Sequence, residues 1–329
     1  MRFLICGLGS IGNRHLQNLE QLGEKDIILY RTYKSTLPEK DEDKYPIETN
    51  LQRALDYKPD AVIISNPTAL HLDVAIPAAK NGCHLLIEKP ISNSMQRIDE
   101  LHSIIQKNTC RVLVAFQFRF HPSLKYIRTN LAKGILGKIY YVHAHWGEYL
   151  PNWHPWEDYR HSYSARKELG GGVLLTLCNP VDYLSWIIGK IESIQGFLGN
   201  SSKLEMDVED HAEVLLRFRN GIAGSMHLDF YQQPTQHTLE FIGANGTMKW
   251  DNKDGIVYIS KGGDNWKKVF EPVPGFNRND LFLEEMHHFI NVVKGEEKPI
   301  CPIEDGLFVQ KALDSIKRSD KSGERMYLK

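Results

Sequence analysis

The feature that most constrains the fold is a glycine motif that begins at the seventh residue. Gly7-Leu8-Gly9-Ser10-Ile11-Gly12 directly follows the apolar run 2–6, which is typical of a buried strand. Apolar residues at roughly helical spacing continue after the motif, and Gly23 ends them. In such a strand–turn–helix, the first glycine allows the tight turn, the second lets the backbone approach a pyrophosphate, and the third lets the helix pack closely. The motif therefore predicts a dinucleotide-binding turn that includes Ser10 and Ile11.

The rhythm of apolar residues changes near residue 121. Before it, strand-like runs alternate with helix-like stretches; the strand-like runs lie at 27–30, 60–65, 84–87 and 111–118. After it, alternating strand patterns dominate, with Asn220-Gly221 as a hairpin signal; they lie at 139–146, 191–199, 211–219, 222–230, 237–243 and 247–251. These patterns predict an α/β Rossmann domain with a doubly wound parallel sheet over 1–120. An α+β domain with a large, mostly antiparallel open sheet is predicted over 121–329.

Charge and composition argue against several classes of protein. Forty Lys and Arg against 41 Asp and Glu leave no basic excess for nucleic acid. No apolar run approaches the roughly 18–20 residues of a membrane span. The five scattered cysteines contain no CxxC pair, which favours reduced thiols in the cytoplasm. Fourteen histidines form no HxxxH spacing, so no metal site is expected.

The end of the second predicted strand bears on the choice of cofactor. A carboxylate there usually binds the ribose diol of NAD, but this chain has Arg31, Lys34 and Ser35 instead. Cationic and hydroxyl groups suit a 2′-phosphate, so Arg31 and Ser35 favour NADP(H) over NAD(H). The alternative is that Arg31 lies in solvent and either cofactor binds.

At this point the sequence resembles the glucose–fructose oxidoreductase/inositol dehydrogenase/rhizopine-catabolism (Gfo/Idh/MocA) family. The resemblance covers nearly the whole chain and rests on five blocks in order: GLGSIGNRH at 7–15, SNPTALH at 65–71, IEKP at 87–90, FQFRFHP at 116–122 and ELGGGVLL at 168–175. It implies a Rossmann domain and a substrate-binding α/β domain whose open sheet supports a homodimer or homotetramer. It also implies cofactor contacts beyond the glycine motif, from Asn66, Thr68, His71, Glu88, Lys89 and Gln117.

The resemblance assigns proton transfer and charge stabilisation at the substrate oxygen to Lys89. This lysine follows a predicted strand at the carboxyl edge of the sheet, where ligands bind in this architecture. The family's lysine works with a carboxylate and a histidine after the triple glycine, and here the chain departs from the pattern. One register places Thr176 and Pro180 at those positions; the other, which fits better, places Asn179 at the histidine and Asp182 at the carboxylate.

The missing histidine leaves three explanations open. An asparagine can hydrogen-bond a hydroxyl but has no proton that titrates near neutral pH. Lys89 can transfer the proton alone, or Tyr163, Tyr183 or His154 can replace the histidine. The third explanation is that the chain is slow or inactive.

The stretch 145–163 is rich in aromatic residues and broken by prolines, which suits a sugar. Aromatic rings pack on the apolar faces of a pyranose, while Arg and His side chains bond its hydroxyls. Trp156, Arg160 and Tyr163 are therefore candidate substrate residues. Arg119 and His121 are further candidates, and either arginine could pair with an anionic group of the substrate.

The resulting hypothesis is an NAD(P)-dependent dehydrogenase or reductase that acts on CH–OH groups. Its substrate would be a small carbohydrate-like molecule: a sugar, sugar acid, nucleotide sugar or cyclitol. The rival hypothesis is a catalytically impaired member of the same fold that senses a dinucleotide or sugar. Asn179 favours this rival, whereas the intact pair of Glu88 and Lys89 argues against it.

Overall fold

The chain forms two units in the computed structural model, which describes residues 1–33, 44–154, 157–263 and 265–328. Unit 1 comprises Met1–Gln117, His161–Gly171 and Asn277–Gln310. Unit 2 comprises Phe118–Arg160, Gly172–Phe276 and Lys311–Lys329. The predicted change of domain between residues 120 and 121 lies close to the first crossing between the units. The later crossings, after residues 160, 171, 276 and 310, have no counterpart in the predicted domain boundary.

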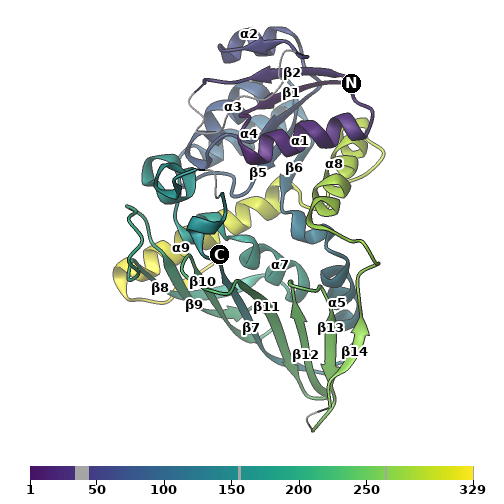
Figure 1. Cartoon of the computed structure of the whole chain (residues 1–329), viewed down its shortest axis with the longest axis vertical. Helices are drawn as coiled ribbons and strands as arrows, with labels where there is room; N and C mark the ends of the chain where they lie inside the picture. The colour runs from purple at the N-terminus through teal and green to yellow at the C-terminus, as the bar shows by residue number, and fades with distance from the viewer. Residues whose placement is uncertain (34–43, 155–156, 264, 329) are drawn as a thin grey trace. The chain divides into compact units, whose positions relative to one another are not determined.

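Unit 1 contains a six-stranded parallel sheet with the order β3-β2-β1-β4-β5-β6 (Figure 1). This is the strand order of a Rossmann fold, and it confirms the predicted doubly wound sheet. The strands are β1 (Arg2–Cys6), β2 (Asp26–Tyr30), β3 (Ile47–Glu48), β4 (Ala61–Ile64), β5 (His84–Glu88) and β6 (Val112–Ala115). All residues of β4 and β6 are buried, as expected for strands covered on both faces.

Helices connect the parallel strands of unit 1. Helix α1 leads from β1 outward to β2, whereas α3 and α4 lead in the opposite direction along the sheet, so right-handed crossovers put them on opposite faces. Within the unit, α3 packs against α4, and α1 packs against α8. The helices are α1 (Ser10–Gln21), α2 (Leu51–Asp56), α3 (His71–Lys80), α4 (Ile98–Asn108) and α8 (Arg278–Lys294). Helix α9 (Ile303–Ser322) runs through the division between the units at residue 310.

Unit 2 contains a nine-stranded sheet with the order β14-β13-β12-β11-β7-β10-β9-β8-β15. All neighbouring strands are antiparallel except β7 and β10, which are parallel. The strands are β7 (Ile139–Gly147), β8 (Ile191–Gly199), β9 (His211–Phe218), β10 (Ala223–Asp229), β11 (Gln236–Gly243), β12 (Gly246–Asp251), β13 (Val257–Ser260), β14 (Lys267–Phe270) and β15 (Met326–Tyr327). The mostly antiparallel sheet and the hairpin at Asn220-Gly221 are both as predicted.

One face of the nine-stranded sheet forms the core of unit 2. In β9, Ala212, Val214, Leu216 and Phe218 are buried and alternate with residues of the other face. This period of two places every second side chain of a strand on the same face. Unit 2 contains the helices α5 (Pro122–Ala132), α6 (Val173–Thr176) and α7 (Asn179–Ile188), together with the part of α9 from Lys311 onward. Helix α5 packs against α7.

The strand predicted over 111–118 is shorter than expected. β6 ends at Ala115, and Gln117–Phe120 form a short 3-10 helix. The apolar run continues because Phe116, Phe118 and Phe120 are buried, although the backbone has already left the sheet. The other 3-10 helices are η1 (Thr68–Leu70), η3 (Leu150–Asn152), η4 (Tyr159–His161), η5 (Tyr163–Ala165) and η6 (Lys167–Leu169).

No single helix among the described residues has the length and apolar composition needed to cross a membrane. One bent pair, 167–176 followed by α7, meets that test by length and composition only. All four residues of α6 and much of α7 are buried, which is equally typical of core helices. The five cysteines are buried and form no disulfide.

Candidate active site

The turn after β1 lies directly against the loop after β4. A Cβ atom at Gly7, whose φ is +96°, would come within 2.6 Å of the backbone nitrogen of Asn66. A Cβ atom at Gly12 would lie 1.9 Å from the carbonyl oxygen of Gly7. The Ser65 hydroxyl donates to that same oxygen at 2.8 Å. The two glycines are therefore required by close backbone packing, as the motif predicts.

The middle glycine of the motif faces open space. A Cβ atom at Gly9 would meet nothing within 4 Å among the described residues. Gly9 is the N-cap residue of α1, and no side chain caps this helix end. The first N–H groups of a helix lack intrahelical acceptors and carry the positive end of its dipole. Gly9, Ser10 and Ile11 thus form a turn that fits the pyrophosphate of a dinucleotide.

His71 links two loops at the carboxyl edge of the parallel sheet. Its Nδ1 lies 3.0 Å from the carbonyl oxygen of Pro90, and its Nε2 lies 2.9 Å from that of Asn66. Burial lowers the pKa of His71, so a neutral ring donates to one of these oxygens at a time. The buried ring lies between the two carbonyl oxygens and so holds the loops that follow β4 and β5 in place.

Glu88 ends β5 and is held from the side of α1. Its Oε1 lies 2.8 Å from Nε2 of the fully buried His15. Lys89 comes next and is half-buried at the carboxyl end of the strand. Ligands bind at this edge of doubly wound sheets. Two other predicted cofactor residues, Thr68 and Gln117, are buried in the short helices η1 and η2.

Arg31 follows β2 and is 8% exposed, so it does not lie in open solvent. Its guanidinium carbon lies 4.2 Å from the centre of the Tyr33 ring, and its backbone N–H donates to Glu48. Ser35, the other residue on which the NADP(H) prediction rests, lies outside the described residues.

In unit 2, the structure brings Arg119 and Asp182 together as a buried ion pair. The guanidinium Nε and Nη2 donate to the carboxylate at 2.6–3.2 Å, and the side chains are 3% and 1% exposed. Two parallel hydrogen bonds of this kind fix both groups in orientation. Removing one partner of such a pair destabilises the fold by about 3–5 kcal/mol, because the other charge is left buried and unpaired.

Asn179 is the first residue of α7 and is 1% exposed. Neither its amide oxygen nor its amide nitrogen has a hydrogen-bond partner among the described residues. Leaving such a group unpaired costs about 1–3 kcal/mol, so this amide would gain from a hydrogen bond to any polar group that reaches it. This is the position at which the family pattern leads one to expect a histidine.

The three candidates to replace that histidine lie in different surroundings. Tyr183 is fully buried, its hydroxyl lies 3.2 Å from Nε2 of His237, and burial raises its pKa. A hydroxyl of this kind is a poor proton donor. Tyr163 is 38% exposed in η5, and His154 is half-buried.

Besides Tyr163, the predicted substrate residues Arg160 and Trp156 belong to the aromatic stretch that follows β7. Arg160 is exposed and pairs with Asp158 and Glu205 at 2.7 and 2.8 Å, contacts that raise its pKa. Trp156 lies outside the described residues. The first three residues of the predicted loop, 145–147, belong to β7, because they complete its pairing with β10.

Glu285 is a fully buried carboxyl group on α8 that no motif in the sequence singled out. Neither carboxyl oxygen has a hydrogen-bond partner among the described residues. Burial, and secondarily the negative charge of Glu88, raise the pKa of Glu285 well above its usual value. Its position on the apolar face of α8, between Leu281 and Phe289, was the signal in the sequence.

Two family descriptions match this chain. Residues 1–116 match "Oxidoreductase family, NAD-binding Rossmann fold", and residues 124–249 match "GFO/IDH/MocA C-terminal domain". Among curated proteins, the myo-inositol 2-dehydrogenase of Thermotoga maritima is 27% identical over 93% of this chain and 92% of its own length. An uncharacterised oxidoreductase of Synechocystis sp. is 28% identical over 57% of this chain, which spans 53% of that protein.

Solved structures share the fold over the whole chain. Levoglucosan dehydrogenase in complex with NADH has a TM-score of 0.87 at 17% identity, covering 100% of this chain and 99% of the other. The WlbA dehydrogenase from Bordetella pertussis, in complex with NADH and UDP-GlcNAcA, has a TM-score of 0.81 at 22% identity, with the same coverage.

The glycine turn gives a matched pair of variants. Gly9→Ala adds a methyl group in open space, so stability should fall by no more than about 1 kcal/mol, the typical cost of alanine at a helix N-cap, while the methyl group obstructs the approach of a pyrophosphate. We expect the Kd for a nicotinamide dinucleotide to rise about tenfold or more. Gly12→Ala should instead destabilise the fold by about 1–3 kcal/mol or more, because its methyl group collides with the Gly7 carbonyl. Calorimetric titration and urea unfolding measure the two effects, and unchanged affinity in Gly9→Ala would contradict the assignment.

The raised pKa of Glu285 makes stability depend on pH. Below about pH 4.5 the carboxyl is protonated in both the folded and unfolded chain, whereas above it only the folded chain keeps the proton. This group's contribution to the free energy of unfolding therefore falls by up to about 1.4 kcal/mol per pH unit as the pH rises toward the folded-state pKa.

Glu285→Gln should remove this pH dependence, so the variant should gain stability relative to the natural chain between about pH 5 and 7. Urea unfolding across this range measures the difference, and the exposed neighbour Glu284→Gln is the control. Parallel stability curves for the Glu285→Gln variant and the natural chain would exclude a buried neutral carboxyl.

Proposed function

The chain belongs to the Gfo/Idh/MocA family of NAD(P)-dependent oxidoreductases, and from this premise we propose that it acts on a CH–OH group. It transfers a hydride between a nicotinamide dinucleotide and a secondary hydroxyl, or the corresponding ketone, of a carbohydrate-like molecule. The observation that carries the proposal is Lys89, which follows Glu88 at the carboxyl end of β5, in the same unit as the glycine turn. The names of relatives, which include an inositol and a levoglucosan dehydrogenase, support the substrate class of sugars, nucleotide sugars and cyclitols.

The glycine turn would hold the cofactor. Gly9 and the N-terminus of α1 would bind the pyrophosphate, and the loop of Asn66 and Thr68 would lie along it. When bound, the nicotinamide ring supplies or accepts the hydride. Hydride transfer leaves the protein two tasks, which are to hold the carbinol carbon in place and to move the hydroxyl proton.

We assign the transfer of the substrate's hydroxyl proton to Lys89. When the alcohol is oxidised, Nζ of Lys89 accepts the hydroxyl proton, and in the reverse direction it donates that proton to the carbonyl oxygen. The ammonium form also stabilises negative charge on this oxygen. His15 holds the side chain of Glu88, the last residue of β5. This contact also fixes the end of the strand that Lys89 directly follows.

Asn179 takes the position of a substrate-orienting residue. Its buried amide offers one acceptor and two donor hydrogens, and neither polar atom has a partner among the described residues. Hydrogen bonds to substrate hydroxyls would satisfy it without any proton transfer. Asp182, fixed by Arg119, keeps the first turn of α7 in place and is proposed to bond the substrate as well.

The residues proposed to bind the sugar lie in the aromatic stretch 145–163. Tyr163 is exposed enough to stack on a pyranose ring, and Trp156 belongs to the same stretch. Arg160 already binds two carboxylates, so an anionic substrate would have to displace Asp158 or Glu205. This arrangement favours bonding of Arg160 to a neutral hydroxyl.

We also propose a homo-oligomer, a dimer or tetramer, in the cytoplasm. Phe197 and Leu215 are 60% and 56% exposed on the same face of the nine-stranded sheet. Apolar patches of this kind mark interaction surfaces, and a second copy would cover them. The five buried thiols suit a reducing compartment. Sedimentation of the purified protein gives the number of copies.

A sensor of dinucleotide or sugar is the second candidate function. It is favoured by Asn179, which cannot act as an acid or base where the family pattern has a histidine. A sensor would bind the dinucleotide without turnover. Following the absorbance at 340 nm with a panel of sugars and cyclitols separates the two functions.

Lys89→Ala should lower turnover by on the order of 10²-fold or more, because the group that moves the proton is lost. The Kd for the dinucleotide should change little, since the glycine turn is intact. The exposed Lys80→Ala on α3 is the control variant. Full activity of Lys89→Ala would refute the role of the lysine, and tight dinucleotide binding with no turnover by the natural chain would favour the sensor.

The preference for NADP(H) rests on Arg31, with NAD(H) as the alternative. If Arg31 pairs with the 2′-phosphate, Arg31→Ala should weaken NADP(H) binding by about tenfold or more and leave NAD(H) binding nearly unchanged. Titration of both dinucleotides measures this, with the exposed Arg53→Ala on α2 as the control. Tighter binding of NAD(H) by the natural chain would contradict the preference.

A further inference from the structure

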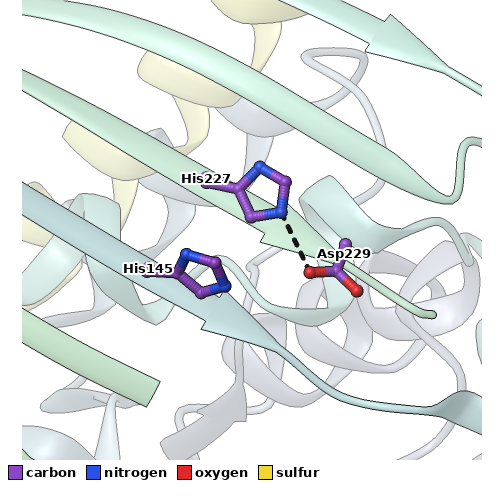
Figure 2. A group of neighbouring side chains, drawn as sticks. All are labelled: His145, His227 and Asp229. Atoms are coloured by element: carbon purple, nitrogen blue, oxygen red, sulfur yellow. Dashed lines mark hydrogen bonds and ion pairs between the residues drawn. The ribbon is translucent and has the colours of Figure 1, made fainter. Parts of the chain in front are cut away.

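Two histidines and an aspartate meet on the open face of the nine-stranded sheet (Figure 2). His145 on β7 pairs directly with His227 on β10, and Gly147 pairs with Asp229. Residues two apart on a strand share a face, so all three side chains emerge on the same side. The opposite face carries the buried residues Ala144 and Leu228 and forms the core.

From this geometry we propose that His145, His227 and Asp229 bind one divalent transition-metal ion, such as Zn²⁺. A ring nitrogen of each histidine and a carboxylate oxygen of Asp229 lie within 4.8 Å of one another. The two rings are 4.6 Å apart between centroids. Donors around a Zn²⁺ ion at about 2.0–2.2 Å lie roughly 3–3.5 Å apart, so modest side-chain rotations close the site.

His145 is the first of these residues that fits a ligand role. Its Nε2 atom is buried and has no hydrogen-bond partner among the described residues. A metal ion would satisfy this nitrogen, whose burial unpaired is otherwise unfavourable.

Asp229 and His227 are already oriented by neighbours. The fully buried Asp229 accepts backbone N–H bonds from Tyr231 and Gln232 through Oδ1, at 2.8 and 2.5 Å, which leaves Oδ2 for the site. Its Oδ2 lies 2.9 Å from Nε2 of His227, whose Nδ1 bonds the carboxylate of Glu213 on β9. A carboxylate behind a ligating histidine is the usual support in metal sites.

Gly147 keeps space beside the carboxylate. A Cβ atom at this position would lie 2.2 Å from Oδ2 of Asp229, so only glycine leaves that oxygen accessible from the β7 side. Nitrogen donors favour Zn²⁺, Co²⁺ or Ni²⁺ over Mg²⁺ and Ca²⁺, which prefer all-oxygen sites. On binding, the ion replaces the proton between His227 and Asp229, and that proton leaves to solvent. The bound ion would tie the ends of β7 and β10 together.

The test is a titration of untagged, chelator-treated protein with Zn²⁺ and Co²⁺, followed by calorimetry and the Co²⁺ absorption spectrum. We expect one ion per chain, a rise in Tm with Zn²⁺, and no such rise with Mg²⁺. His145→Gln should weaken Zn²⁺ binding by about tenfold or more. The matched control is His143→Gln, two residues earlier on the same face. Nδ1 of His143 bonds Ser225, and His143 is not part of the cluster. The Kd of this variant for Zn²⁺ should stay within about threefold of that of the natural chain.

Asp229→Asn provides a second variant, because its amide oxygen can still accept the N–H bonds of Tyr231 and Gln232 while the anionic ligand is lost. It should also bind Zn²⁺ at least about tenfold more weakly. Circular dichroism without metal shows whether each variant folds. Absence of saturable binding up to about 0.1 mM Zn²⁺ would overturn the proposal, as would equal loss in His143→Gln and His145→Gln.

Discussion

The contact between the turn after β1 and the loop after β4 is the constraint on which unit 1 depends. The backbone of Gly7 lies so close to Asn66 that no side chain fits between them, and Ser65 adds a hydrogen bond to the same turn. Because the turn is fixed there, α1 begins beside the sheet edge and brings His15 to Glu88. His71 then joins the loops after β4 and β5. A few short-range contacts thus organise the whole carboxyl edge of the parallel sheet.

Much of the fold was predictable from short stretches of sequence, because the pattern of apolar residues within each stretch reflects which faces of its strand or helix are buried. The buried strands of unit 1 are continuous apolar runs, and strands such as β9 alternate with a period of two. The repeated crossing of the chain between the units was not predictable, since it depends on contacts between residues far apart in the sequence. For the same reason, the spacing of histidines along the sequence did not indicate the cluster of His145 and His227, which the pairing of β7 with β10 brings together. The expectation of no metal site came from that spacing alone.

The family resemblance located Asn179 but could not describe its surroundings. A sequence shows that a histidine is absent, whereas only the structure shows that this amide is buried and has no hydrogen-bond partner within the described part of the chain. Likewise, Arg119 and Asp182 were separate candidates in the sequence, and the structure joins them into one ion pair. Each group therefore fixes the orientation of the other, because two parallel hydrogen bonds hold the guanidinium and the carboxylate in one geometry.

The parallel pairing of β7 and β10 in an otherwise antiparallel sheet has an evolutionary consequence. Because both strands run the same way, their last residues emerge side by side at one edge, and each side chain's face is set by counting along its own strand. Inserting or deleting a single residue within β7 would turn His145 inward and Trp146 outward. Lineages of this chain should therefore tolerate length changes in the loops but not within these two strands.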